Sequence, residues 1–294
     1  MAQRIVITGA GGMVGRELAD QSRREGREVL PLTSAECDIT DADALRHFVE
    51  SGDVVLNCAA YTQVDAAETD QSRAHAVNAL GPGHLAAVCA QAGAGLVHIS
   101  TDYVFGADRQ RRTPYEIDEQ PGPVNVYGHT KLAGERAVLA AKPDAHVVRT
   151  SWVYRGGDGA DFVATMRRRA AGDGPVDVVA DQIGSPTYTG DLVSALLQIV
   201  DGGVRPGVLH AVNTGSASRF ELARETFAAL GADPERVRPV GSDRHPRPAP
   251  RPSYTVLSVH RTAEAGLRML RDWREALVAA VGNESAPGPL PSTP

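Results

Sequence analysis

Short apolar runs and longer amphipathic stretches alternate along the first half of the chain. Five near-continuous apolar runs have strand character: RIVIT (4–8), EVLPLT (28–33), DVVLNCAA (53–60), GLVHIST (95–101) and HVVRTSW (146–152). Helical periodicity fills the intervals near 14–25, 41–50, 71–92 and 127–142. Strands that are apolar on both faces and separated by helices indicate a parallel sheet covered on both sides. Because such crossovers are right-handed, we predict an α/β fold with a doubly wound parallel sheet.

The alternation loosens after about residue 150, and a smaller lobe is expected there. Helical patterns occur at 160–171, 190–201 and 219–230, with strand patterns at VDVVAD (176–181) and VLHAVN (208–213). We expect a first domain at 1–150, rejoined by parts of 183–215, and a C-terminal lobe formed mainly by 151–282. The Pro/Ser-rich residues 283–294 are expected to form a flexible tail.

Composition narrows the classes of function. The 294 residues are 42% hydrophobic and 22% charged, as in an ordinary globular protein. The net charge of −6 argues against a nucleic-acid-binding protein but leaves room for a small anionic ligand in a local basic pocket. Three cysteines (Cys37, Cys58 and Cys89) lack metal-ligand spacing and are expected to be buried in a reducing compartment. Without a signal peptide or a membrane-length apolar run, we expect a cytoplasmic protein with no membrane partner.

A glycine-rich turn follows the first predicted strand and opens the first predicted helix. In VITGAGGMVGRELA, Gly9, Gly12 and Gly15 are spaced by three residues. Residues without a Cβ let the backbone approach a pyrophosphate that the helix N-terminus then faces, so 1–150 is predicted to bind a dinucleotide. The alternative is a βα turn without a ligand. The tip of the second strand has no acid, with Glu36 only beyond it, so the cofactor is NADPH or NADH, with NADPH favoured.

Tyr127 and Lys131 lie four positions apart at the start of a predicted helix and therefore share one face. Thr101 ends the strand GLVHIST, at the sheet edge where ligands of doubly wound folds bind. Such a tyrosine can protonate a carbonyl oxygen, with a neighbouring ammonium and a positively charged or dipolar cofactor expected to lower the pKa of its phenol. The pair alone is weak evidence, since it also occurs as an ordinary surface pair. With Thr101 and the glycine turn, it predicts catalysis.

Several longer stretches resemble one known family. They are NCAAYTQVDAAE (57–68), STDYVFGA (100–107), NVYGHTKLAGE (125–135), RTSWVY (149–154), DQIGSPTYTGDL (181–192) and RPAPRPSY (247–254). Together they resemble the extended short-chain dehydrogenase/reductase superfamily and, within it, the dTDP-4-dehydrorhamnose reductase family, over roughly residues 4–280. The resemblance implies a Rossmann-like fold and NAD(P)H-dependent reduction of dTDP-4-dehydro-β-L-rhamnose, a nucleotide-diphosphate sugar.

The resemblance also implies roles for individual residues. Tyr127 would be the proton donor, with Lys131 and Thr101 assisting. The cofactor-binding residues would be Gly9, Gly12, Met13, Val14 and Gly15 in the glycine turn, Asp38 and Ile39 near the adenine, Ala59, Ala60, Tyr61 and Thr62 near the nicotinamide, and Tyr127 and Lys131. The substrate-binding residues would be Thr101, Asp102, Trp152 and Arg251, the last near the diphosphate. Asn78 would have a structural or a relay role, and His129 is expected to face solvent.

The sequence leaves alternatives open for metal binding, for the oligomeric state and for the class of reaction. Some family members bind Mg²⁺ through glutamates at a dimer interface; here Glu17 is present, but residues 190–191 offer no clear second glutamate. We predict no bound metal and leave a homodimer open. An NAD-dependent epimerase or dehydratase is a second hypothesis, although Tyr103, not an acid, follows Asp102. A non-catalytic regulatory subunit is a third, although the chain keeps Thr101, Tyr127 and Lys131.

Overall fold

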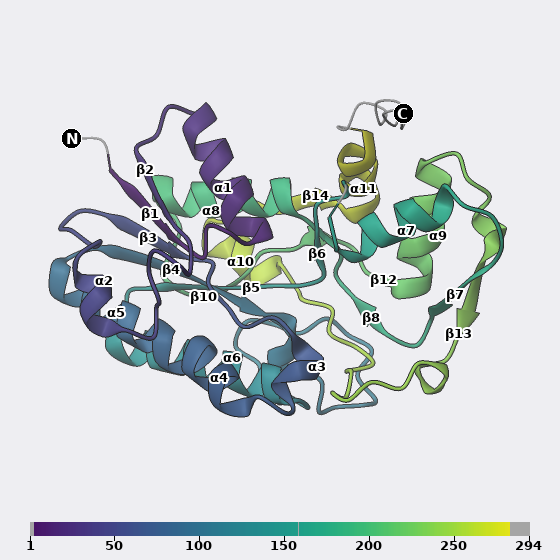
Figure 1. Cartoon of the computed structure of the whole chain (residues 1–294), viewed down its shortest axis with the longest axis horizontal. Helices are drawn as coiled ribbons and strands as arrows, with labels where there is room; N and C mark the ends of the chain where they lie inside the picture. The colour runs from purple at the N-terminus through teal and green to yellow at the C-terminus, as the bar shows by residue number, and fades with distance from the viewer. Residues whose placement is uncertain (1–2, 158, 283–294) are drawn as a thin grey trace, which may run out of the picture.

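A parallel sheet lies between two layers of helices in the computed structural model, which describes residues 3–157 and 159–282 (Figure 1). Six strands of this described part form the sheet in the order β10-β5-β4-β3-β1-β2, and all neighbours run parallel. Their bounds are β1 Ile5–Thr8, β2 Val29–Leu32, β3 Val54–Asn57, β4 Gly95–Thr101, β5 His146–Thr150 and β10 Gly207–His210. The chain leaves β1 toward β2 and then returns to β3 on the other side of β1. The sheet therefore has its switch point between β1 and β3, where ligands of such folds bind.

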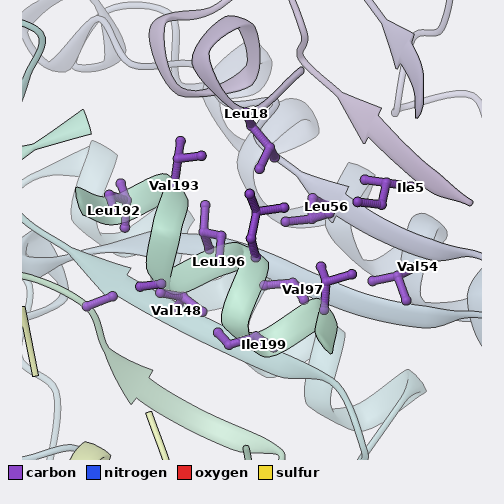
Figure 2. Close-up of a cluster of buried hydrophobic side chains, with 14 of the residues drawn as sticks. Ile5, Leu18, Val54, Leu56, Val97, Val148, Leu192, Val193, Leu196 and Ile199 are labelled. Carbon is purple, nitrogen blue, oxygen red and sulfur yellow. The ribbon is translucent and has the colours of Figure 1, made fainter. Parts of the chain in front are cut away.

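Each face of the sheet is covered by its own helices. The helices of the sheet region are α1 Met13–Arg24, α2 Ala42–Arg46, α3 Val64–Ala67, α4 Gln71–His75, α5 Gly81–Ala92, α6 Val126–Ala141 and α8 Thr189–Asp201. Helices α1 and α8 pack together on one face, and α2, α5 and α6 cover the other (Figure 1). Leu18, Val193 and Leu196 meet strand residues such as Leu56 and Val148 in a core cluster on the α1/α8 face (Figure 2).

The remaining elements form a smaller lobe beside the carboxyl ends of the strands (Figure 1). Its helices are α7 Phe162–Ala170, α9 Arg219–Ala229 and α11 Trp273–Gly282. The short helix α10 His260–Glu264 lies beside β10 of the main sheet, where the His210 N–H donates to Thr262 Oγ1 (2.9 Å). Its strands form two-stranded pairs: β6 Val153–Tyr154 with β9 Thr187–Tyr188, β7 Val176–Val179 with β13 Val237–Val240, β8 Ile183–Gly184 with β12 Ala217–Ser218, and β11 Asn213–Thr214 with β14 Leu270–Asp272. Helix α9 begins with a capping box, in which Ser218 Oγ accepts the Glu221 N–H and the Glu221 carboxylate accepts the Ser218 N–H.

The predicted α/β fold with a doubly wound parallel sheet is confirmed, and every predicted strand of the first half is present. The helix predicted at 41–50 is shorter, and the one at 71–92 is interrupted by a π-helical turn at Ala76–Leu80. VLHAVN supplies β10, which pairs with β5 and returns the chain to the main sheet. The predicted tail lies outside the described residues. No helix in the described ranges is long and apolar enough to cross a membrane.

Candidate active site

Three clefts lie at the carboxyl ends of the strands and in the neighbouring lobe. The first, here the central cleft, has a volume of about 400 Å³ and contains Thr101, Tyr127, Lys131 and Trp152. The second, the turn cleft, has a volume of about 790 Å³ and runs from the glycine turn to Asp38. The third, the arginine cleft, has a volume of about 400 Å³ and lies in the lobe. The central and turn clefts share Gly12, Cys58, Ala60 and Thr62, so they adjoin.

The glycine turn is shaped by contacts between backbone segments. A Cβ on Gly9, whose φ is +70°, would lie 2.5 Å from Ala59 N, and one on Gly15 would lie 2.4 Å from Gly9 O. Gly11 faces open space instead, since its Cβ would meet only Thr33 Cγ2, at 3.8 Å, whereas a Cβ on Gly12 would lie 3.3 Å from Gly9 O. Helix α1 begins here without a side-chain cap and without an acid in its first turn. An uncapped helix start beside an open cleft suits a diphosphate, so these residues fit the dinucleotide.

Two buried asparagines fix the loop that follows β3. Asn57 Oδ1 accepts hydrogen bonds from Thr8 Oγ1 (2.9 Å) and from the Ala59 N–H (3.1 Å). Asn78 Oδ1 accepts the Tyr61 N–H (2.8 Å), and Asn78 Nδ2 donates to Tyr61 O (3.1 Å). These bonds favour the structural role over the relay role for Asn78. Sequence reasoning missed Asn57, whose only signal is its position at a strand end.

Helix α6 carries Tyr127 and Lys131, and its glycines explain its close approach to the site. A Cβ on Gly128 would lie 2.1 Å from Tyr103 O, and one on Gly134 would lie 2.1 Å from Asn78 O. The helix therefore packs directly on backbone at both positions. Asn125 caps its start by accepting the Gly128 N–H (2.8 Å). The sequence VYGHTKLAGE is thus a helix with two contact points for neighbouring backbone.

Lys131 is buried, and its Nζ donates to Ile99 O of β4 (2.7 Å). Burial lowers the pKa of Lys131 to about 8, and the nearby Glu135 carboxylate opposes this shift. Burial raises the pKa of the Tyr127 phenol above its usual value, and the Thr101 hydroxyl opposes the rise only in part. The expectation that Lys131 and a bound cofactor together lower the pKa of Tyr127 stays a prediction. Desolvation dominates, and the ammonium is directed at a strand carbonyl.

A buried ion pair anchors the same helix to the sheet. Glu135 lies one turn beyond Lys131 and bonds Arg149 of β5 through both oxygens (2.8 and 2.7 Å). Ser100 Oγ also donates to the Glu135 carboxylate (2.5 Å). The side chains of Glu135 and Arg149 are only 3% and 4% exposed. Neither residue was predicted to be important from the sequence, because the sequence alone does not distinguish it from an ordinary charged surface residue.

Asp102 is a buried carboxylate that accepts hydrogen bonds from three hydroxyl groups. The donors are Thr255 Oγ1 (2.6 Å), Ser151 Oγ (2.8 Å) and Thr101 Oγ1 (3.1 Å). Burial raises the pKa of Asp102, and these bonds oppose the rise. The Thr101 hydroxyl has one hydrogen, so it can donate either to Asp102 or to a substrate oxygen.

Trp152 lines the central cleft in a constrained conformation. Its φ of +45° lies in the left-handed region, which is rare for a bulky residue. A Cβ on Gly184 would come within 2.5 Å of its indole, and the Arg219 guanidinium stacks 3.6 Å from a ring centroid. The indole is thus held between two neighbours, with its place in the cleft fixed.

Arg251 lines the arginine cleft, not the central one, and it is already paired. Its Nη1 lies 2.9 Å from Asp65 Oδ1 and donates to Ala249 O (2.8 Å). Burial would raise the pKa of Asp65, but Arg251, the Ala249 N–H and Arg247 outweigh it and lower that pKa. Sequence reasoning missed Arg219 in the same cleft, because its stacking partner lies far away in the sequence.

Every residue predicted to be catalytic or to bind cofactor or substrate lines one of the three clefts, although the individual roles stay predictions. The central cleft holds Gly12, Met13, Val14, Gly15, Ala60, Thr62, Thr101, Asp102, Tyr127, Lys131 and Trp152; the turn cleft adds Gly9, Asp38, Ile39, Ala59 and Tyr61. His129 is exposed, as predicted. Cys58 is only half-buried and borders two clefts, contrary to expectation. Residues 3–157 and 159–282 contain no group of three or more potential metal ligands. The absence of a bound metal stays a prediction.

The fold and these clefts define an extended short-chain dehydrogenase/reductase, and comparisons with known proteins narrow the class. The family model described as RmlD substrate binding domain matches residues 3–285. A dTDP-4-dehydrorhamnose reductase of Mycolicibacterium smegmatis is 75% identical over 100% of this chain and 90% of its own. One of Mycobacterium tuberculosis is 56% identical over 99% and 98%. The chain therefore belongs to the dTDP-4-dehydrorhamnose reductase family.

A solved structure of the same family supports the fold in detail. The crystal structure of dTDP-4-dehydrorhamnose reductase from Bacillus anthracis, in complex with NADP, has a TM-score of 0.91 and 35% identity. The match covers 97% of this chain and 100% of that one.

Proposed function

We propose that the protein reduces the 4-keto group of dTDP-4-dehydro-β-L-rhamnose to give dTDP-L-rhamnose, with NADPH as the favoured cofactor. The observation that carries this is the convergence of Thr101, Tyr127, Lys131 and Trp152 on one cleft that adjoins the glycine turn. The identity of the sugar rests on relatives named dTDP-4-dehydrorhamnose reductase, at 75% and 56% identity. The site chemistry by itself specifies reduction of a carbonyl group.

The chain's own residues would bind the substrate and supply the proton. Tyr127 donates the phenolic proton to the new oxygen at C4; burial raises the pKa of its phenol and so keeps the proton in place until then. Lys131, on the same face of α6, supplies a positive charge that stabilises the phenolate left behind. Trp152 offers a flat face to the C–H surface of the sugar. Reduced nicotinamide, when bound, supplies the hydride.

The dinucleotide would bind in the turn cleft, and the lining of this cleft supports that assignment. The open space at Gly11, beside Gly12, leaves room for the diphosphate, and Asp38 and Ile39 line the far end, where the adenosine would lie. The Glu36 carboxylate accepts hydrogen bonds from the Thr33 N–H (2.8 Å) and hydroxyl (2.7 Å), so it is already engaged at the end of β2. This leaves Thr33 and Ser34, not a free acid, beside the ribose position, which favours NADPH.

The domain organisation, location and assembly also belong to the proposal. Residues 1–150 with parts of 183–215 would form the dinucleotide-binding domain, because α8 and β10 pack on the main sheet. Residues 151–282 would mainly form the substrate lobe. We further propose a cytoplasmic location. We also propose a homodimer, which a measurement of molar mass in solution would test.

The deciding experiment follows the loss of reduced-nicotinamide absorbance when purified protein meets dTDP-4-dehydro-L-rhamnose, with NADPH and NADH in parallel. Oxidation that depends on the sugar supports both reaction and substrate, and faster oxidation of NADPH supports the cofactor preference. Cofactor binding without oxidation would contradict the reductase assignment. In that case, nicotinamide that copurifies tightly with the protein would favour the epimerase or dehydratase hypothesis. Absence of copurified nicotinamide would favour the hypothesis of a regulatory subunit.

A further inference from the structure

The arginine cleft combines positive charge with an apolar wall. Phe162, Met166, Val178 and Val179 form the apolar part, and Gln182 and the exposed carboxylate of Asp177 lie beside them. Arg219, His245, Arg247 and Arg251 supply the basic groups. A flat base against apolar side chains with a diphosphate among arginines is the arrangement that this lining favours.

The three arginines of this cleft differ in whether they already have an anionic partner. Arg251 and Arg247 both face Asp65, with closest N–O distances of 2.9 and 3.6 Å. Arg219 stacks on Trp152 at 3.6 Å and faces Phe162 at 5.1 Å. Within the described ranges its guanidinium makes no ion pair or hydrogen bond, and the Asp102 carboxylate and the Arg251 guanidinium act on it only at longer range.

An arginine in this state has capacity left for a ligand. Stacking occupies the face of the guanidinium, whereas its N–H groups lie in the plane and stay free to donate. Arg219 is half-buried, and this burial lowers the pKa of its guanidinium. A phosphate oxygen in the cleft would supply the missing acceptor.

We infer that Arg219 binds the diphosphate of the nucleotide sugar, while Arg251 is held by Asp65 and braces the cleft. This inference rests on the proposed function, since it assigns a residue to that substrate. Because Arg219 also stacks on Trp152, one side chain joins the diphosphate position to the wall of the central cleft. Binding the diphosphate would then also hold the indole against the sugar.

The competing explanation is that Arg219 only supports Trp152 by packing, and matched variants separate the two. Arg219→Met keeps a long unbranched side chain against the indole but removes the charge. Arg219→Lys keeps the charge but loses the planar fork. Arg224→Met is the control, because Arg224 lies on the same helix and pairs with Glu235 outside the cleft.

The experiment titrates dTDP and thymidine into each NADPH-saturated variant by calorimetry. Arg219→Met should weaken dTDP binding by at least about tenfold, the scale of a charged hydrogen bond, and change thymidine binding by less than about twofold. Arg219→Lys should lose less, and Arg224→Met should match the unsubstituted protein.

Three results would overturn the inference. Unchanged dTDP affinity in Arg219→Met would show that the diphosphate lies elsewhere. Equal weakening of dTDP and thymidine would show that Arg219 acts through the shape of the cleft. Absence of dTDP binding by the unsubstituted protein would remove the ligand altogether. Failure to reduce the keto sugar while dTDP still binds would instead contradict the proposed function. The titrations with dTDP would then still decide whether Arg219 binds the diphosphate.

Discussion

The cofactor side and the substrate side of the site are built from different materials. Around the glycine turn, the positions that a Cβ would take on Gly9 and Gly15 are filled by backbone atoms of Ala59 and Gly9. On the substrate side, the equivalent position on Gly184 is filled by the indole of Trp152, which Arg219 covers. Backbone contacts fix a shape largely independent of side-chain identity, whereas a stack of side chains changes with each substitution. Specificity for the sugar is therefore expected to vary more easily than dinucleotide binding.

Helix α6 and strand β5 lie between the two regions, and a substitution in the buried ion pair that joins them should have the largest effect on stability. Glu135→Gln would leave the buried Arg149 without its anion, at a cost of about 3–5 kcal/mol in the free energy of unfolding. Glu235→Gln is the matched control, because Glu235 is 73% exposed in its pair with Arg224 and should change stability by under about 1 kcal/mol. Urea denaturation measures both, and equal losses would contradict the role of the buried pair.

Gly15→Ala should damage the cofactor side alone. The new Cβ would lie 2.4 Å from Gly9 O and 2.8 Å from Ala10 Cα, so the turn must open. We expect NADPH affinity to fall by about 100-fold, equivalent to about 2.7 kcal/mol, with dTDP affinity within about twofold of the original. Gly11→Ala, whose Cβ meets only a Thr33 methyl at 3.8 Å, should keep the melting temperature. Unchanged NADPH binding by the Gly15 variant would refute the backbone-built turn.

Gly184→Ala is the mirror experiment on the substrate side. Its Cβ would come within 2.5–2.8 Å of the Trp152 indole and displace the ring. The KM for the keto sugar should rise by about tenfold, the scale of one displaced aromatic contact, and NADPH affinity should stay constant. A variant that loses cofactor and sugar binding together would show that the two sides are not independent.

The pH dependence of turnover should report Lys131 and give the smallest effect. Burial lowers the pKa of Lys131 to about 8, so the ammonium is present below that pH and lost above it. We expect kcat to fall severalfold as pH rises from about 7 to 9, because the phenolate of Tyr127 loses its stabilising charge. Lys131→Met should turn over more slowly and lack this decline. A flat profile in the unsubstituted protein would contradict the proposed role of the ammonium.

The sequence predicted the sheet well because its strands carry their own signal. Continuous apolar runs such as GLVHIST become β4 at Gly95–Thr101, within the predicted range. The π-helical turn at Ala76–Leu80 was missed because nothing in the local periodicity marks it. In the lobe, helices α7 and α9 and strand β7 lie within their predicted ranges. The sequence missed pairs such as β8 with β12, because they contain two residues per strand and depend on distant partners.

The residues of the candidate site also divide into those that the sequence could predict and those that it could not. Tyr127 and Lys131 could be named because helical spacing places them on one face. The direction of Lys131 toward Ile99 O could not, since it depends on how α6 packs on β4. Arg219 could not be named either, because its function would come from stacking on Trp152 across the lobe. Local spacing reveals residues on one element, and tertiary packing decides which of them meet.

The most direct test of the account is the turnover of Tyr127→Phe, measured beside its affinity for NADPH. Removing one hydroxyl should lower kcat for the keto sugar by about 10²–10⁴-fold and leave the Kd for NADPH within about twofold. His129→Ala, an exposed position on the same helix, should keep full activity. A phenylalanine variant that retains most of its turnover would contradict the assignment of Tyr127 as the proton donor.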